Sequence, residues 1–267
     1  MGAVYEAEDV TLSRRVALKV LDIPDPGGDL ARRLARESRV LASLEHPGIV
    51  PVHDAGTLAD GRVFYAMKLV EGERLDEHLI RVPSVADRVR LFLRVAEAVA
   101  FAHSKGVLHR DLKPGNVMVG SFGEVLVMDW GLAKTFQEPD DGRWAVLGTP
   151  GFMAPEQVAG GAMDVRTDVY GLGASLRALL DSAGAPRPGR ALQAIVAKAT
   201  AADPAARYPD VPSLARDVVS YLDGERVDAH REGLTGRAAR LLKRHRVAVL
   251  LIVAYLTARA LMTFWPR

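Results

Sequence analysis

Three side chains near the middle of the chain have the types and spacing that phosphate chemistry requires. Asp111 is followed five residues later by Asn116, and Asp129 begins an Asp-Trp-Gly turn further on. Transfer of a γ-phosphoryl group needs a carboxylate beside the attacking hydroxyl and oxygen ligands that hold Mg²⁺ on the phosphates. Asp111 suits the first role. Asn116 and Asp129 suit the second, because Mg²⁺ and Mn²⁺ prefer hard oxygen donors.

The segment around Asp111 is more specific than these three residues alone. Residues 109–116 read His-Arg-Asp-Leu-Lys-Pro-Gly-Asn. An isolated loop aspartate is often only an Asx-turn residue, but the complete octapeptide at a fixed distance from an Asp-x-Gly turn is a strong signal. It resembles the catalytic loop of eukaryotic-like protein kinases, specifically the bacterial Ser/Thr branch.

Two further motifs support this resemblance in the order expected along the chain. Residues 16–19 (Val-Ala-Leu-Lys) resemble the β3 lysine motif, and residues 154–156 (Ala-Pro-Glu) resemble the end of the activation segment. The resemblance covers roughly residues 1 to 224. It implies an α+β, two-lobed protein kinase fold, with a β-rich small lobe over residues 1–70 and a mainly helical large lobe over residues 71–224.

The resemblance also implies roles for individual residues. Asp111 would orient the substrate hydroxyl and accept its proton, and Lys113 would neutralise charge on the γ-phosphate. Lys19 would contact the α/β-phosphates and pair with Glu37, although a solvated Lys19 and a Glu37–Arg33 pair are the simpler alternatives. Asn116 and Asp129 would bind Mg²⁺ or Mn²⁺. The implied ATP-binding residues are Val4, Ala17, Lys19, Met67, Lys68, Val70 and Met118.

The beginning of the chain departs from the family pattern. Only Gly2-Ala3-Val4 matches the end of the glycine-rich phosphate loop, so we expect the small lobe to lack its first strand. A wrongly assigned start and a truncated gene both explain this, and intact catalytic residues favour the first. Two functions follow: phosphorylation of protein Ser/Thr by ATP, or a weakly active or inactive pseudokinase that serves as a membrane-tethered binding module.

Hydrophobic patterns predict the elements that position these residues. Residues 3–7, 15–20 and 62–70 read as strands, another strand begins at residues 49–50, and residues 30–44 read as a helix.

A longer helix should deliver the catalytic loop. Ser84 and Asp87 form a capping-box-like start, apolar residues line one face through Ala102, and Gly106 ends the helix. A rigid helix here would position Asp111 in the cleft.

Several residues are expected to support the site without taking part in the chemistry. We interpret His109 as a packed structural residue and Trp130 as an aromatic plug in place of the usual Phe. By resemblance, Asp168 anchors the backbone of the catalytic loop and Arg207 pairs with Glu156.

Composition limits the remaining possibilities. The chain has 267 residues, a net charge of +2 and no Cys, so neither general nucleic-acid binding nor disulfides are expected. No signal peptide is recognisable, which predicts a cytoplasmic catalytic part. The oligomeric state, the protein substrate and the signal cannot be predicted.

The C-terminal part has a different composition. Residues 225–246 form a basic linker, and residues 247–265 are almost entirely apolar, long enough for one membrane-spanning helix. We expect this helix to anchor the protein to the inner membrane. Arg259 argues against this interpretation because a charge within a membrane is costly, so an interfacial or partner-buried helix is the alternative.

Overall fold

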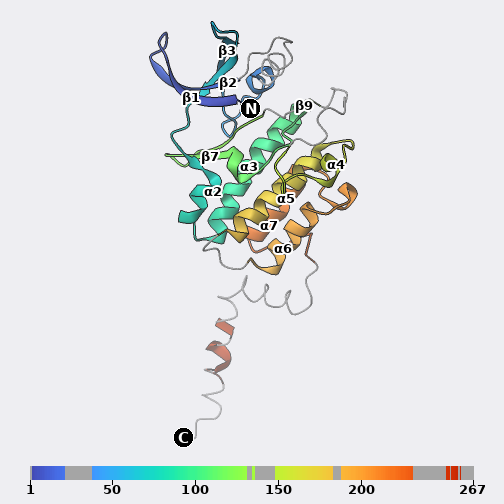
Figure 1. Ribbon diagram of the computed structural model, residues 1–267. Helices are drawn as coiled ribbons and strands as arrows, with labels where there is room; N and C mark the ends of the chain where they lie inside the picture. Colours follow the sequence, from blue (N-terminus) through green and yellow to red (C-terminus); the bar gives the residue numbers. More distant parts are fainter. Residues whose placement is uncertain are drawn as a thin grey trace.

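The computed structural model is a two-lobed molecule with a small β-sheet lobe beside a larger helical lobe (Figure 1). The structure describes residues 2–21, 38–130, 134–135, 148–182 and 188–230, together with residues 251–252, 254–257 and 259. The α+β architecture predicted from the sequence is confirmed.

The small lobe contains a four-stranded antiparallel sheet in the order β1-β2-β4-β3. Its strands are β1 (Gly2–Asp9), β2 (Arg14–Leu21), β3 (Val52–Thr57) and β4 (Val63–Lys68). The predicted strands at residues 3–7 and 15–20 lie within β1 and β2, and β4 lies within the predicted range 62–70. Of the helix predicted over residues 30–44, residues 38–42 are helical, and residues 30–37 lie outside the described part of the chain.

The prediction of a strand beginning at residues 49–50 is wrong, because β3 begins at Val52. Ile49 instead forms an isolated parallel bridge to Val127, whose N–H donates to the Gly48 carbonyl at 2.8 Å. Pro51 has no N–H to continue a ladder. This short stretch therefore ties the small lobe to the large one before the chain joins the sheet.

The large lobe is built around three helices, α3, α5 and α7, which pack against one another (Figure 1). Its helices are α2 (Leu75–His78), η1 (Leu79–Arg81), α3 (Val85–Ser104), η2 (Pro114–Asn116), α4 (Pro155–Val158), α5 (Val165–Asp181), α6 (Arg190–Ala199), η3 (Pro204–Ala206) and α7 (Val211–Leu222). Its short strands are β5 (Gly72–Arg74), β6 (Val107–Leu108), β7 (Val117–Gly120), β8 (Val125–Val127) and β9 (Lys134–Thr135).

Helix α3 begins where its sequence predicts. The Ser84 side chain accepts a hydrogen bond from the Asp87 N–H at 3.4 Å, which satisfies one of the unpaired donors at a helix N-terminus. Val89, Phe92 and Val99 are at most 1% exposed and form its inner face. Burial of each such side chain stabilises the fold by about 1.5–3 kcal/mol. The helix that precedes the catalytic loop is therefore stably packed against the core.

A buried cation joins three elements of the large lobe. Arg88 of α3 is fully buried and donates to the carbonyls of Leu179 at 2.8 Å and Leu79 at 3.1 Å, and to the Ser182 hydroxyl. Burial lowers the pKa of Arg88. These contacts place a positive charge at the C-terminal end of α5, where it complements the helix dipole.

Near the C-terminus, the structure describes residues 251–252, 254–257 and 259 as helical, and Figure 1 draws short helical pieces there in red. These helical residues expose their apolar side chains, as in Leu251, Ile252, Tyr255 and Leu256. Among the residues that the structure describes, no helix is both long enough and apolar enough to cross a membrane. Most of the predicted span at residues 247–265 lies outside the described residues.

Candidate active site

The catalytic loop begins directly after α3. Lys105 ends the helix, and Gly106 adopts the left-handed conformation, φ +74°, that glycine tolerates without a steric penalty. The chain then forms β6, which pairs with β9 next to the Asp-Trp-Gly turn. The catalytic loop and the Asp-Trp-Gly turn are thereby brought to the same edge of the large lobe.

One buried carboxylate holds the backbone of this loop. The N–H groups of His109 and Arg110 donate to the two oxygens of Asp168, each at 2.8 Å, and Asp168 is 1% exposed. His103 of α3 binds the same carboxylate at 2.8 Å. Burial acts to raise the pKa of Asp168, but the hydrogen bond and the charge of His103 outweigh it, and the pKa is lowered.

Arg110 occupies a strained conformation within this loop. Its φ of +72° lies in the left-handed region, which is uncommon for a residue with a side chain. Asp168 binds its N–H, and the Gln157 side-chain amide donates to its carbonyl at 2.8 Å. Strain of about 1–3 kcal/mol persists only where surrounding contacts enforce it, as at functional sites.

The Asp111 carboxylate is held from two sides. One oxygen accepts hydrogen bonds from the Thr149 N–H at 3.0 Å and hydroxyl at 3.1 Å. The other accepts from Lys113 Nζ and from Asn116 Nδ2, both at 2.9 Å. Lys113 Nζ also donates to the Thr149 hydroxyl. Asp111, Lys113 and Asn116 are therefore brought together as the sequence predicts, and Thr149 completes the cluster.

Asn116 is oriented so that a cation could be bound. Its side-chain nitrogen donates to both the carbonyl and the carboxylate of Asp111, which leaves the amide oxygen as the atom for a metal. Its backbone carbonyl accepts from the Met128 N–H at 2.8 Å, directly before Asp129. The two predicted metal ligands therefore lie on adjacent, hydrogen-bonded segments.

The described residues include no group of three His, Asp or Glu side chains that could hold a metal alone. A pair of protein oxygens fits Mg²⁺ nonetheless, since this ion is commonly bound by one or two carboxylates together with substrate phosphates.

Asp129 joins the two lobes. Its carboxylate lies 2.8 Å from Lys19 Nζ of β2, and its φ of +56° is again left-handed. Burial acts to raise the pKa of Asp129, but the charge and hydrogen bond of Lys19 outweigh it and the pKa is lowered. The Asp129 carboxylate is therefore in the charged form that metal binding requires. Glu37, the predicted partner of Lys19, lies outside the described residues.

His109 and Trp130 support the loop structurally. His109 is fully buried, its Nε2 lies 3.0 Å from the Met128 carbonyl, and its ring lies 4.6 Å from that of Trp130. Trp130 is 1% exposed, and its indole N–H donates to the Val127 carbonyl. This contact satisfies the only polar atom of the buried indole.

Four of the predicted ATP-binding residues share one face of the small-lobe sheet. Val4 lies opposite Lys19, and Ala17 lies opposite Met67, in antiparallel pairs whose side chains point to the same side. Ala17 and Met67 are buried, whereas Val4 is 58% exposed. Because Lys19 reaches Asp129 from this face, the face is turned toward the catalytic loop.

The other predicted ATP contacts lie in the connection between the lobes and in β7. The Lys68 N–H donates to the Pro51 carbonyl at 3.0 Å, so only its carbonyl could take part in adenine binding. Val70 lies between β4 and β5, and Met118 lies in β7, paired with Arg74 of β5.

Two supporting residues have no recognisable signal in the sequence. Gln157 is 4% exposed and is the residue that binds the Arg110 carbonyl, and His103 is the side chain that joins α3 to Asp168. By contrast, the predicted Arg207–Glu156 pair is present with two contacts, at 2.7 and 2.8 Å. The family motifs therefore indicated the Arg207–Glu156 pair, whereas no motif indicated Gln157 or His103.

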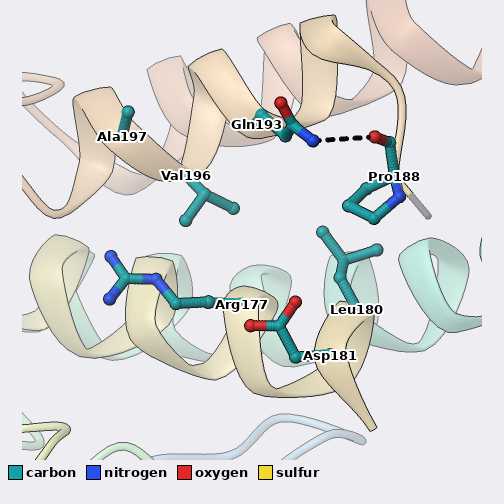
Figure 2. Close-up of a pocket in the computed structure, with 7 residues that line it drawn as sticks. All are labelled: Arg177, Leu180, Asp181, Pro188, Gln193, Val196 and Ala197. Atoms are coloured by element: carbon teal, nitrogen blue, oxygen red, sulfur yellow. Dashed lines mark hydrogen bonds between the residues drawn. The ribbon is translucent and has the colours of Figure 1, made fainter. Parts of the chain in front are cut away.

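A cavity of about 260 Å³ lies away from this cluster, between α5 and α6 (Figure 2). Leu180, Val196 and Pro188 form its apolar part, and the Gln193 amide donates to the Pro188 carbonyl at 3.0 Å. It shares no lining residue with the catalytic loop.

Comparisons with known proteins agree with this geometry. The sequence profile of the family described as "Protein kinase domain" matches residues 1–201. The chain belongs to the protein kinase family. Curated relatives named serine/threonine-protein kinase PknD come from Chlamydia pneumoniae, 33% identical over 283 residues, and Chlamydia muridarum, 35% identical over 288 residues.

Solved structures show the same relationship. Two crystal structures of the Mycobacterium tuberculosis PknI kinase domain match with TM-scores of 0.64 and 0.65, at 31% and 30% identity. These matches cover 82% and 84% of this chain and 90% and 91% of those chains. The matches to the two PknD proteins cover 84% of this chain but only 30% of each relative. Membership of the family implies ATP and a divalent cation in general.

Proposed function

We propose that this kinase transfers the γ-phosphate of ATP to Ser or Thr side chains of protein substrates. The observation that carries the proposal is the Asp111 cluster, in which a carboxylate, a lysine and a metal-ligand amide converge within hydrogen-bond distance. The relatives named as serine/threonine-protein kinases support the same activity.

Each residue of the cluster has a physical role in this reaction. Asp111 orients the acceptor hydroxyl and takes its proton. Lys113, 2.9 Å from that carboxylate, stabilises the charge on the transferred phosphate. Thr149 binds both side chains and so fixes their separation.

The metal and the nucleotide are held by the neighbouring residues. Asn116 and Asp129 would bind Mg²⁺ or Mn²⁺, which neutralises phosphate charge when bound. Lys19 would contact the α/β-phosphates, with Glu37 as its second partner, and Val4, Ala17, Met67, Lys68, Val70 and Met118 would enclose the adenosine.

Labelled phosphate transfer by the full chain tests the proposal. Wild type should label Ser or Thr of a generic protein substrate in the presence of Mg²⁺, and Asp111→Asn should reduce the rate by about 10²–10⁴-fold, the usual range for a lost general base. Asp223→Asn, a surface change after α7, is the matched control and should retain the wild-type rate. If wild type transferred phosphate to no protein substrate, the proposal would be contradicted and a membrane-tethered pseudokinase would be favoured.

We further propose that residues 247–265 attach the kinase to the inner membrane, with residues 225–246 as a basic linker on the cytoplasmic side. The exposed apolar side chains of Leu251, Ile252, Tyr255 and Leu256 support this assignment. Deletion of residues 247–267 should move the protein from the membrane fraction to the supernatant of a cell lysate. An unchanged distribution would contradict it.

A further inference from the structure

A cationic side chain from the interlobe connection rests on the catalytic loop. Arg74, the last residue of β5, packs its guanidinium against Gly115, next to the metal-ligand residue Asn116. A Cβ atom at position 115 would lie 2.8 Å from Arg74 Nη2 and 3.4 Å from its Cζ. The glycine therefore provides the space that the guanidinium occupies.

The Arg74 guanidinium is held by Asp76, but not all of its N–H donors take part in that contact. Its Nε and Nη2 donate to the two oxygens of Asp76, at 3.1 and 2.5 Å. Within the described part of the chain, Nη1 donates to no group. Arg74 has 52% of its side chain exposed. One edge of a planar fork that suits carboxylate and phosphate groups is thus open to an incoming molecule.

The position of Gly115 limits how far this edge lies from the reaction. Gly115 is four positions after Asp111, which allows at most about 14 Å between their Cα atoms. The Asn116 side chain donates back to the Asp111 carbonyl at 2.8 Å, so the loop is folded and the true separation is shorter. An extended peptide advances about 3.3 Å per residue. A residue two to four positions from the acceptor hydroxyl can therefore reach Arg74.

The contacts of Asp111 indicate on which side of the acceptor residue a bound peptide would pass Arg74. Thr149, which precedes α4, binds one carboxylate oxygen of Asp111, whereas Asn116, which follows Gly115 in the chain, binds the other. Figure 1 shows α2, which follows Arg74, and α4 on opposite sides of the large lobe. A peptide seated at Asp111 would thus meet Arg74 on only one side of its acceptor.

We infer that Arg74 is a specificity-determining residue that selects protein substrates with an acidic side chain two to four residues from the phosphorylated Ser or Thr. This inference rests on the proposed kinase activity and names its substrate class. Asp76 offsets the long-range charge of Arg74, so recognition depends on direct contact of the open guanidinium edge with a carboxylate. A basic side chain at the same place would lose that contact and be repelled.

Peptide kinetics with the full chain test the inference. The probes are Ser peptides of one neutral sequence that carry Glu, Gln or Lys three residues before, or three residues after, the acceptor. At low salt, the Glu peptide of one of the two series should have a kcat/KM about 3–10-fold above its Gln counterpart, the size of an exposed charge-assisted contact. Arg74→Gln should bring that ratio to within about twofold, and Arg74→Glu should shift the preference toward Lys.

Two further variants separate selectivity from general damage. Gly115→Glu should also abolish the preference, because its side chain would displace or neutralise the guanidinium. Arg81→Gln is the matched control, since Arg81 is exposed on the same segment and pairs with Glu73; its Glu/Gln ratio should equal that of wild type.

The outcomes distinguish this inference from the proposed function. No phosphorylation of any peptide or protein would contradict the kinase activity itself. Phosphorylation with equal kcat/KM for all peptides, or a preference that Arg74→Gln leaves unchanged, would overturn only the inference. A raised KM for ATP in Arg74→Gln, with the peptide ratio unchanged, would assign Arg74 to the nucleotide and likewise overturn it.

Discussion

The two sides of the candidate active site are held in very different ways. On the large-lobe side, Asp111 and its loop have several independent contacts, from Asp168, Gln157 and Thr149. On the small-lobe side, Lys19 reaches the large lobe through a contact with Asp129, whose side chain is 51% exposed. The first arrangement is buried and redundant, and the second includes a carboxylate that solvent can reach.

This difference fits the tasks of the two sides. A base that must meet a hydroxyl within a fraction of an ångström benefits from a preformed loop. The Lys19 and Asp129 side chains must instead exchange their mutual ion pair for phosphates and a cation. Because the Asp129 carboxylate is half exposed, these ligands can reach the pair from solvent. We expect the large-lobe contacts to determine stability and the Lys19–Asp129 pair to affect mainly binding.

Asp168→Ala should have the largest effect on stability. The substitution leaves the N–H groups of His109 and Arg110 buried without an acceptor and removes the partner of His103. The loss of unfolding free energy should be about 3–5 kcal/mol, measured by urea denaturation. Asp164→Ala, at the exposed N-cap of the same helix, is the control and should cost about 1 kcal/mol. Equal losses in the two variants would show that the buried carboxylate is not special.

Glu156→Gln should come next and should depend on pH. Burial acts to raise the pKa of Glu156, but the hydrogen bond and charge of Arg207 and the hydrogen bonds from the backbone and Thr167 together outweigh it, and the pKa is lowered. A carboxyl whose pKa falls on folding stabilises the protein fully above its unfolded pKa of about 4.5. This contribution is lost as the pH falls through the folded-state pKa.

The free energy of unfolding of wild type should therefore exceed that of Glu156→Gln by roughly 2–3 kcal/mol at pH 7. This difference in stability should narrow below about pH 4.5. Denaturation curves at pH 7, 5 and 3.5 measure this difference. A difference that stays constant or widens toward acid would contradict the role of the Glu156–Arg207 pair.

Lys19→Met should have the smallest effect on stability, about 1 kcal/mol or less, because its partner carboxylate is half exposed. Its nucleotide affinity should nevertheless fall by about tenfold or more, since a charge-assisted phosphate contact is lost. Thermal unfolding and titration with a fluorescent ATP analogue measure the two effects separately. Strong destabilisation by Lys19→Met would contradict the view that the Lys19–Asp129 pair affects mainly binding.

Much of this fold could be predicted because its elements follow local rules. Ser84 caps α3 as its hydroxyl and the following apolar positions indicate, and the catalytic loop follows Gly106 as expected. The error at residues 49–50 arose because an apolar pair does not reveal which sheet it will join. There, the bridge from Ile49 to Val127 of the other lobe takes the place of the expected strand.

The site could be predicted only in part, for a related reason. Asp111, Lys113 and Asn116 lie within one motif, so their proximity follows from the sequence. The contacts of Gln157 with Arg110 and of Arg74 with Gly115 join residues that are 47 and 41 positions apart in the sequence. No spacing rule specifies such pairs, because tertiary packing alone brings them together.

The most direct test of the account compares Asp111→Asn with Asp129→Asn in the full chain, measuring the Mg²⁺ dependence of ATP affinity and the rate of phosphate transfer. Asp111→Asn should keep MgATP affinity within about threefold of wild type and lose transfer by at least about 10²-fold. Asp129→Asn should lose the Mg²⁺-dependent part of the affinity and transfer together. Unchanged Mg²⁺-dependent affinity in Asp129→Asn, or unchanged transfer in Asp111→Asn, would contradict the division of roles between these two carboxylates.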